Sequence, residues 1–171
     1  MRQPWVAGVA GGVGTSTVAG ALQAADLGVY RGGPVDAVVC RDTVSSLGRS
    51  HQAVQHAGTS PVLLVVATSR APTSKPAAAR ITMVRPYVGA VVAVPWVGRW
   101  CELVDPWTQA AQVLATAQPD KHLQPFAAAM RQAHRELVAQ LRATTPVAAA
   151  APPVSPARGT ASPVAGADRP S

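Results

Sequence analysis

The stretch Gly8-Val9-Ala10-Gly11-Gly12-Val13-Gly14-Thr15-Ser16-Thr17 decides how this 171-residue chain is interpreted. It joins an apolar run at 5–10 to an alanine-rich segment of helical length at 16–25. Glycines let a loop curl its backbone N–H groups around an anion, and the helix that follows adds the positive end of its dipole. Ser16 and Thr17 supply hydroxyls that can cap the helix or ligate magnesium held by a phosphate. The stretch therefore suits a phosphate, and the alternative is a glycine turn with a purely structural role.

Outward from this loop, short β-branched runs alternate with segments of helical length. Because each run is almost continuously apolar, it is typical of a strand buried on both faces, and crossover helices are what cover both faces of a parallel sheet. The pattern predicts an α/β fold, an open and mostly parallel sheet of about four or five strands with flanking helices. Strands are expected at 5–10, 37–41, 62–68 and 89–94, and helices at 16–25, 44–57, 75–84, 107–117 and 125–142.

The composition limits the class of protein. The longest apolar runs are far shorter than the roughly 18 residues of a membrane-spanning helix, which argues against an integral membrane protein. Two cysteines cannot build a disulfide framework, so Cys40 and Cys101 are expected to be reduced thiols in a cytoplasmic protein. The alternative, that the apolar stretch at 5–22 belongs to a signal peptide, is disfavoured by Gly8, Gly11, Gly12 and Gly14, because glycine is a poor helix former.

The chain divides by composition into two parts. We expect an α/β domain at 1–145 that ends in a C-terminal helix, followed by a disordered tail at 146–171. The tail is rich in Pro and Ala and offers no large apolar residue beyond valine, so it cannot bury enough surface to offset its chain entropy.

The segment Gly11-Gly12-Val13-Gly14-Thr15-Ser16-Thr17 resembles the deviant Walker A loop of the ParA/MinD class of P-loop ATPases, which reads Lys-Gly-Gly-x-Gly-Lys-[Ser/Thr]-Thr. It is closer still to the CpaE/TadZ branch, whose loop reads Gly-Gly-x-Gly-Ala-Ser-Thr. The resemblance covers about ten residues. It implies a P-loop NTPase-like fold, binding of ATP or ADP with magnesium at residues 11–17, and magnesium ligation by Ser16 together with an acid such as Asp42.

The chain departs from the active ATPase pattern at both lysine positions, which are Ala10 and Thr15. A lysine at the phosphates stabilises charge in phosphoryl transfer, and losing one preorganised electrostatic group commonly costs about 2.7–4 kcal/mol in the barrier. The sequence therefore predicts weak or absent ATPase activity. A rival resemblance, Gly8-x-x-x-Gly12-x-Gly14 to the turn of short-chain dehydrogenases, lacks the Tyr-x-x-x-Lys of those enzymes, because Pro34 and Val91 stand four positions after the two tyrosines.

Basic residues follow the ends of the expected strands. Between Arg41 and Arg99 there are seven basic residues and one acid, Asp42. Because the carboxyl ends of parallel strands lie on one rim with the glycine loop, we hypothesise that Arg41, Arg70 or Arg99 partly replaces the missing lysine as a bidentate phosphate binder. The alternative is that these arginines are simply solvated. Such a basic stretch also leaves non-specific nucleic-acid binding open.

Asp42 follows an apolar strand, as a Walker B acid does, although a helix-cap or turn role ahead of 44–57 fits it equally well. In ParA/MinD-like proteins a loop late in the sheet contacts the adenine base, so the resemblance implies that Trp96 or Trp100 could stack on a base. Packing is the preferred interpretation of both rings. His and Cys are too dispersed for a structural metal site. Cys40 lies beside Arg41, which could lower the pKa of its thiol, but an inert buried cysteine is preferred.

The last expected helix carries one apolar stripe, which is formed by Phe126, Met130, Ala133, Leu137 and Leu141. Packing on the domain is the preferred interpretation. The alternative is implied by a resemblance to MinD proteins, which end in a basic amphipathic helix that reaches membranes, and it is peripheral contact with a membrane or docking to a partner.

Two functions follow from these observations. The first is a nucleotide-binding, ParA/MinD-type protein that acts as a positioning, partition or transfer accessory factor. The second is a non-catalytic adaptor for a protein partner in a larger assembly, which binds no nucleotide.

Overall fold

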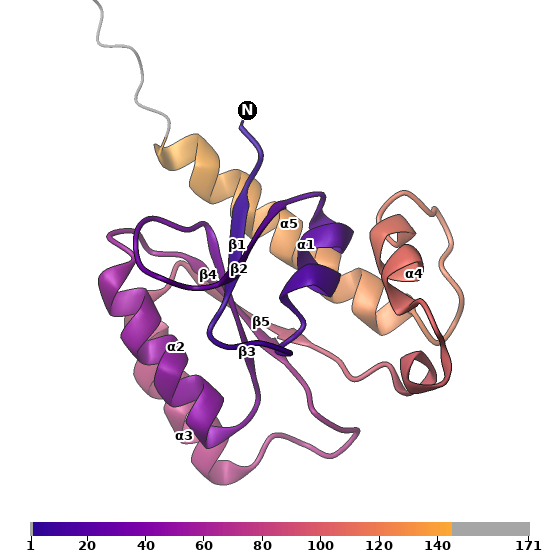
Figure 1. The fold of residues 1–171 in the computed structure, drawn as a ribbon, viewed down its shortest axis with the longest axis horizontal. Coiled ribbons are helices and arrows are strands. Elements are labelled where there is room, and N and C mark those ends of the chain that lie inside the picture. The colour runs from indigo at the N-terminus through magenta and orange to yellow at the C-terminus, as the bar shows by residue number, and fades with distance from the viewer. Residues whose placement is uncertain (1, 145–171) are drawn as a thin grey trace, which may run out of the picture.

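A computed structural model describes residues 2–144 as an α/β domain built on one sheet (Figure 1). The predicted tail at 146–171, and with it the predicted domain boundary, lies outside the described residues. All strand pairs are parallel, and their spatial order is β2-β1-β3-β4-β5. The strands are β1 (Trp5–Gly8), β2 (Ala25–Val29), β3 (Ala37–Arg41), β4 (Val62–Val66) and β5 (Ala90–Val94). The α/β class and the parallel sheet are therefore as the apolar runs predict.

Helices cover the sheet on both faces. One layer holds α2 (Val44–His56) and α3 (Lys75–Val84), and the opposite layer holds α1 (Thr15–Leu22), α4 (Pro106–Gln112) and α5 (Gln124–Thr144) (Figure 1). Two short 3₁₀ helices, η1 (Arg85–Tyr87) and η2 (Gly98–Glu102), complete the elements. The chain thus winds in one direction from β1 to β2 and in the other from β3 to β5. Such a change of direction creates a crevice at the carboxyl ends of β1 and β3, where doubly wound sheets bind ligands.

The strand β2 is absent from the sequence prediction, which extends the first helix to residue 25. The helix ends at Leu22 because Gln23 adopts a left-handed conformation (φ 51°) and Ala24 N–H bonds back to the carbonyl of Ala19. β2 was missed because Asp26 and Gly28 interrupt its apolar pattern. As an edge strand it lies outside the core, so it needs no continuous apolar run.

The other differences are at element ends. The helix α4 stops at Gln112 rather than at residue 117. The chain continues as a turn, in which the carbonyl of Gln112 accepts from the N–H groups of Ala115 and Thr116 and from the Thr116 hydroxyl. β3 and α3 have the predicted bounds, and α5 runs from 124 to 144 against a predicted 125 to 142.

The apolar stripe of α5 is buried against the sheet, as the preferred interpretation of this helix expects. All five residues of the stripe belong to the core, and Phe126, Met130, Ala133 and Leu137 pack in the same cluster as the strand residues of that face. A second cluster on the other face joins the strands to α2 and α3. The two clusters together fix the sheet between its helical layers.

The link from β2 to β3 contains no helix. The backbone N–H of Asp36 donates to the carbonyl of Trp5, and the Asp36 carboxylate accepts from the N–H of Trp5 at 2.7 Å. The same carboxylate pairs with both terminal nitrogens of Arg2 at 2.7 Å, while Arg2 also lies 4.8 Å from the Trp5 ring centroid. This buried carboxylate therefore ties the start of β1 to the start of β3.

Candidate functional site

The glycine loop after β1 is shaped by close approach and by positive φ angles. A Cβ on Gly8 would lie 2.0 Å from Thr15 Oγ1 and 2.8 Å from Val13 Cγ2, so no side chain fits there. Gly12 and Gly14 have φ of 72° and 97°, a region that side chains rarely adopt. Gly11, in contrast, has open space around it. Three of these four glycines are thus required by the shape of the loop.

The helix α1 begins at this loop with its N-terminus open. Its N-cap residue is Gly14, and no side chain caps it. The first N–H groups of any α-helix have no partner within the helix, and they carry the positive end of its dipole. The loop therefore leaves backbone donors at the carboxyl end of β1, where an anion could accept from them.

A pocket of about 370 Å³ lies beside this helix start. We call it the glycine-loop pocket. It is lined by residues of the glycine loop and by residues at the ends of β3, β4 and β5. This is the position of the crevice expected at the carboxyl ends of the strands. Its lining residues are Gly12, Val13, Gly14, Thr17, Val18, Arg41, Val66, Ala67, Thr68, Val94, Pro95, Trp96, Val97, Trp100, Cys101 and Phe126.

Arg41 is the cation of this pocket. Its Nε donates to the carbonyl of Gly12 at 3.1 Å, and its Nη2 donates to the same oxygen. A guanidinium has five N–H donors, so these two bonds leave the others available to a ligand. Of the three arginines proposed to replace the missing lysine, Arg41 is the one that the structure brings to the glycine loop.

Arg70 and Arg99 are exposed and do not line the glycine-loop pocket. The Arg70 guanidinium lies beside Gly98 instead, since a Cβ on Gly98 would be 3.2 Å from its Nη2. The positions of strand ends in the sequence show that these residues share a rim. They do not show how far the loops carry each side chain from it.

The two residues assigned to magnesium do not converge. Asp42 Oδ1 accepts from the backbone N–H of Thr68 at 3.0 Å and from its hydroxyl at 2.7 Å. The Asp42 side chain lines a separate pocket with Thr73 and Ile81. Ser16 is exposed and outside the glycine-loop pocket, whose hydroxyls come from Thr17 and Thr68. Asp42 thus acts as a tie between the loops after β3 and β4, which is closer to the turn role considered for it.

Thr15, at the second lysine position, is buried and lies next to Gly8. Thr15 is therefore not among the residues that line the glycine-loop pocket.

Cys40 is also buried, and burial raises the pKa of its thiol to about 12. The lowering effect considered for the neighbouring Arg41 is therefore not found, and an inert thiol is the result.

The two tryptophans of the pocket differ. Trp100 packs edge to face on Phe126, with ring centroids 4.7 Å apart, and its Nε1 donates to Gln109 Oε1 at 3.3 Å. Trp96 is 39% exposed at the pocket. Trp100 thus has the packing role that was preferred for both tryptophans, while Trp96 is the ring that a planar ligand could reach.

Sequence reasoning missed most of the apolar wall. Val66, Val94 and Val97 line the pocket because they sit at or just beyond the carboxyl ends of β4 and β5. Because these valines lie at or near the ends of predicted strands, the sequence could have indicated that they line the pocket. The sequence did not indicate Phe126 or Cys101, because the path of the chain after β5 determines which way these two side chains face.

Comparisons with known proteins give no relative: no family model, no curated protein and no solved structure matches this chain. Within residues 2–144, no group of three or more His, Cys, Asp or Glu side chains is arranged to hold a metal ion. In the same range, none of the helices combines the length and the apolar content needed to cross a bilayer.

Proposed function

We propose that this chain is a P-loop-like protein of the ParA/MinD type that binds ATP or ADP and hydrolyses it slowly or not at all. One observation carries the proposal. The Arg41 guanidinium and the open N-terminus of α1 line the same pocket, whose opposite wall is apolar and aromatic. A phosphorylated ligand with a planar base needs both kinds of surface.

The phosphate end of the ligand has two sources of attraction. Backbone donors at a helix N-terminus suit an anion, and a guanidinium adds charge-assisted hydrogen bonds. At the other end, Trp96 is exposed enough to stack on a base, an interaction worth about 1–3 kcal/mol in nucleic-acid complexes. The pocket volume of about 370 Å³ falls within the usual range for small-molecule sites.

The chemistry for hydrolysis is missing from this pocket. Ala10 and Thr15 replace the lysines, and no carboxylate is among the lining residues. Asp42 is held by Thr68, and Ser16 lies outside the pocket. The described residues therefore do not fit the magnesium ion that accompanies ATP in active P-loop enzymes, and we expect nucleotide affinity to be the same with and without it.

A non-hydrolysing nucleotide site suits an accessory protein that positions, partitions or transfers a cargo through a protein partner. The two cysteines are free, one buried and one exposed, which fits a reducing compartment such as the cytoplasm. Both the partner and the cytoplasmic location are part of the proposal.

The first test is calorimetric titration of the full chain with ATP and ADP, with and without magnesium. We expect Arg41→Ala to weaken nucleotide affinity by roughly 10-fold to 100-fold, the value of one or two hydrogen bonds to a charged group. Arg99→Ala is the matched control, because it removes the same charge from an exposed position outside the pocket. Equal losses in both variants would mean that general charge, and not the pocket, holds the nucleotide.

Cys101 provides a second readout at the same site. Its thiol lines the pocket and is exposed, whereas Cys40 is buried and its pKa is raised to about 12. An alkylating reagent should therefore modify Cys101 selectively, and Cys101→Ser should abolish the modification. If a nucleotide occupies the pocket, the rate of modification falls as the nucleotide concentration rises.

The alternative function is an adaptor that binds no nucleotide, and one contact favours it. The Arg41 guanidinium already bonds to the Gly12 carbonyl, so the loop is closed by the chain itself. This alternative would be supported if the folded protein gave no binding heat with ATP or ADP, and if neither nucleotide changed the rate of Cys101 modification.

A further inference from the structure

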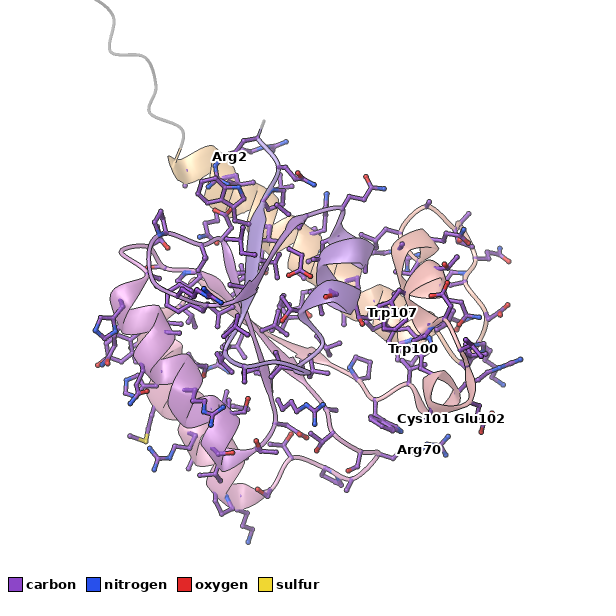
Figure 2. All side chains as sticks on the ribbon, in the orientation of Figure 1. Arg2, Arg70, Trp100, Cys101, Glu102 and Trp107 are labelled. Atoms are coloured by element: carbon purple, nitrogen blue, oxygen red, sulfur yellow. The ribbon has the colours of Figure 1, made fainter. Side chains whose placement is uncertain are left out.

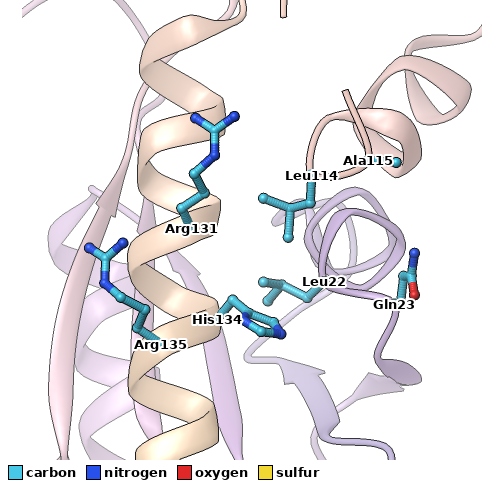
Figure 3. Close-up of a pocket in the computed structure, with 7 residues that line it drawn as sticks. All are labelled: Leu22, Gln23, Leu114, Ala115, Arg131, His134 and Arg135. Carbon is cyan, nitrogen blue, oxygen red and sulfur yellow. The ribbon is translucent and has the colours of Figure 1, made fainter. Parts of the chain in front are cut away.

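A groove unrelated to the glycine loop lies between α5 and the end of α1. Its volume is about 440 Å³, and we call it the α1–α5 groove. Leu22 and Leu114 form an apolar floor, and Arg131, His134 and Arg135 form a basic wall along α5. Figure 3 shows His134 extending from α5 toward Leu22, with Arg131 one turn away on the same helix.

The basic wall lacks an anion. Arg131 and Arg135 are four residues apart on a helix, a spacing at which like charges repel. No carboxylate lines the groove, and neither arginine is in the single salt bridge found within the described residues, which joins Arg2 to Asp36. A ligand with carboxylates and an apolar side chain would match both the wall and the floor.

The same chain carries such a surface around the start of α4. We call residues 102–107 the acidic tip. It bears Glu102 and Asp105, both exposed, and Val104, which is 97% exposed. Trp107, at the start of α4, is 55% exposed (Figure 2). Hydrogen bonds from Thr108 lower the pKa of Asp105, so this carboxylate stays charged over the neutral range.

The tip cannot fill the groove of its own chain without unfolding α4. The two carboxylates of the tip precede this helix and the groove residue Leu114 follows it, so the seven residues of α4 hold these groups about 10 Å apart. The segment at 145–171 is not acidic, since its two arginines outnumber its one aspartate. A second copy is the occupant whose surface is complementary.

We propose that the acidic tip of one copy docks into the α1–α5 groove of a second copy, so that the chains associate head to tail. Each copy then keeps one free tip and one free groove. A contact of this kind joins different surfaces, and it continues into longer chains unless it closes into a ring. The contact is small, which makes it weak and reversible.

The test is sedimentation velocity on the full chain over a range of concentrations. At 0.1 M salt we expect the sedimentation coefficient to rise with concentration beyond the value of a dimer. Raising the salt to 1 M shortens the screening length from about 10 Å to about 3 Å and should weaken the association roughly tenfold. Arg131→Glu with Arg135→Glu should abolish the rise, as should Glu102→Gln with Val104→Gln, which leaves a tip with no charge that could pair with the reversed groove.

A matched control separates the groove from net charge. Arg49→Glu with Arg80→Glu removes the same charge from exposed positions on the other helical layer and should associate like the original chain. All these positions are exposed, so circular dichroism should show an unchanged fold.

Mixing the two defective variants gives the sharpest result. The groove variant keeps a working tip, and the tip variant keeps a working groove. An equimolar mixture should therefore form dimers and nothing larger, although each variant alone is monomeric. A mixture that stays monomeric, an original chain that is monomeric throughout, or equal loss in the Arg49/Arg80 control would each overturn the proposal.

Discussion

The strands β3 and β2 flank the same strand, β1, yet they contribute differently to the protein. The first four residues of β3 are buried, while none of the five residues of β2 is. β3 pairs with strands on both sides and carries Arg41 at its end, whereas β2 pairs with β1 alone. The difference indicates that burial on the β3 side holds the glycine-loop pocket together, while β2 contributes mainly backbone pairing.

The edge strand also carries features that limit further pairing. Gly28 has φ 67°, and the register of β2 against β1 shifts at this point. Asp26 Oδ1 accepts from the N–H of Gly28 at 2.8 Å, which removes one donor from the open edge. A bulge and a charged residue on an edge strand are both known protections against edge-to-edge aggregation.

The largest expected effect extends this contrast to β4, another buried strand, and compares it with the edge strand β2. Leu64→Ala in β4 removes a side chain that is fully buried, and we expect it to lower the free energy of unfolding by about 2–5 kcal/mol. Leu27→Ala in β2, at a residue that is 47% exposed, should cost much less, about 0.5–1 kcal/mol. Urea denaturation of both variants gives the comparison. Similar losses would show that β2 is as integral to the core as β4.

The second prediction concerns two glycines of one loop. Gly8→Ala would place a Cβ 2.0 Å from Thr15 Oγ1, and we expect this overpacking to cost about 1–3 kcal/mol or more. Gly11→Ala meets no atom within 4 Å and should change stability by less than about 0.5 kcal/mol. Thermal melts of the two variants test the shape of the loop without any ligand. A destabilised Gly11→Ala together with a stable Gly8→Ala would contradict this loop geometry.

The two sides of the sheet also differ in how well the sequence predicts them. β3 and β4 are continuous apolar runs because they are buried on both faces, so periodicity finds them with little error. β2 reads Ala-Asp-Leu-Gly-Val, a pattern that burial does not constrain. A strand held by backbone hydrogen bonds alone leaves no apolar signal, and only the pairing with β1 defines it.

The candidate site shows the same limit. The position of the glycine loop and of Arg41 follows from strand ends on one rim, so sequence order places them. Asp42 is the next residue, but its side chain turns to Thr68, a contact between loops 26 residues apart. Side-chain direction after a strand end depends on such loop contacts, and the sequence alone does not contain them.

A third prediction uses pH to probe the buried side of the sheet. Burial raises the pKa of Cys40 from 9.0 to about 12, so the folded state keeps the thiol proton after the unfolded state has lost it. Stability from this group is complete below pH 9 and is lost as the pH rises toward 12, at up to about 1.4 kcal/mol per pH unit.

Cys40→Ala should therefore flatten the fall in stability above pH 9, measured by urea denaturation at successive pH values. Burial also raises the pKa of Tyr30, which remains in both proteins and so does not affect their difference. Parallel pH profiles for the two proteins would mean that the Cys40 thiol ionises as freely when folded as when unfolded.

The smallest effect concerns the turn that leads into β2. Gln23 is the one residue other than glycine with a positive φ within 2–144, and its side chain is exposed. A left-handed conformation strains any residue with a Cβ, while glycine adopts it freely at the end of a helix. Gln23→Gly should thus raise the free energy of unfolding by up to about 1 kcal/mol, because the relief of strain exceeds the added entropy of the unfolded chain.

Gln112→Gly, at the end of α4 where φ is not positive, should instead destabilise the protein. Thermal melts that showed the opposite order would mean that the edge side of the sheet carries no strain at this turn.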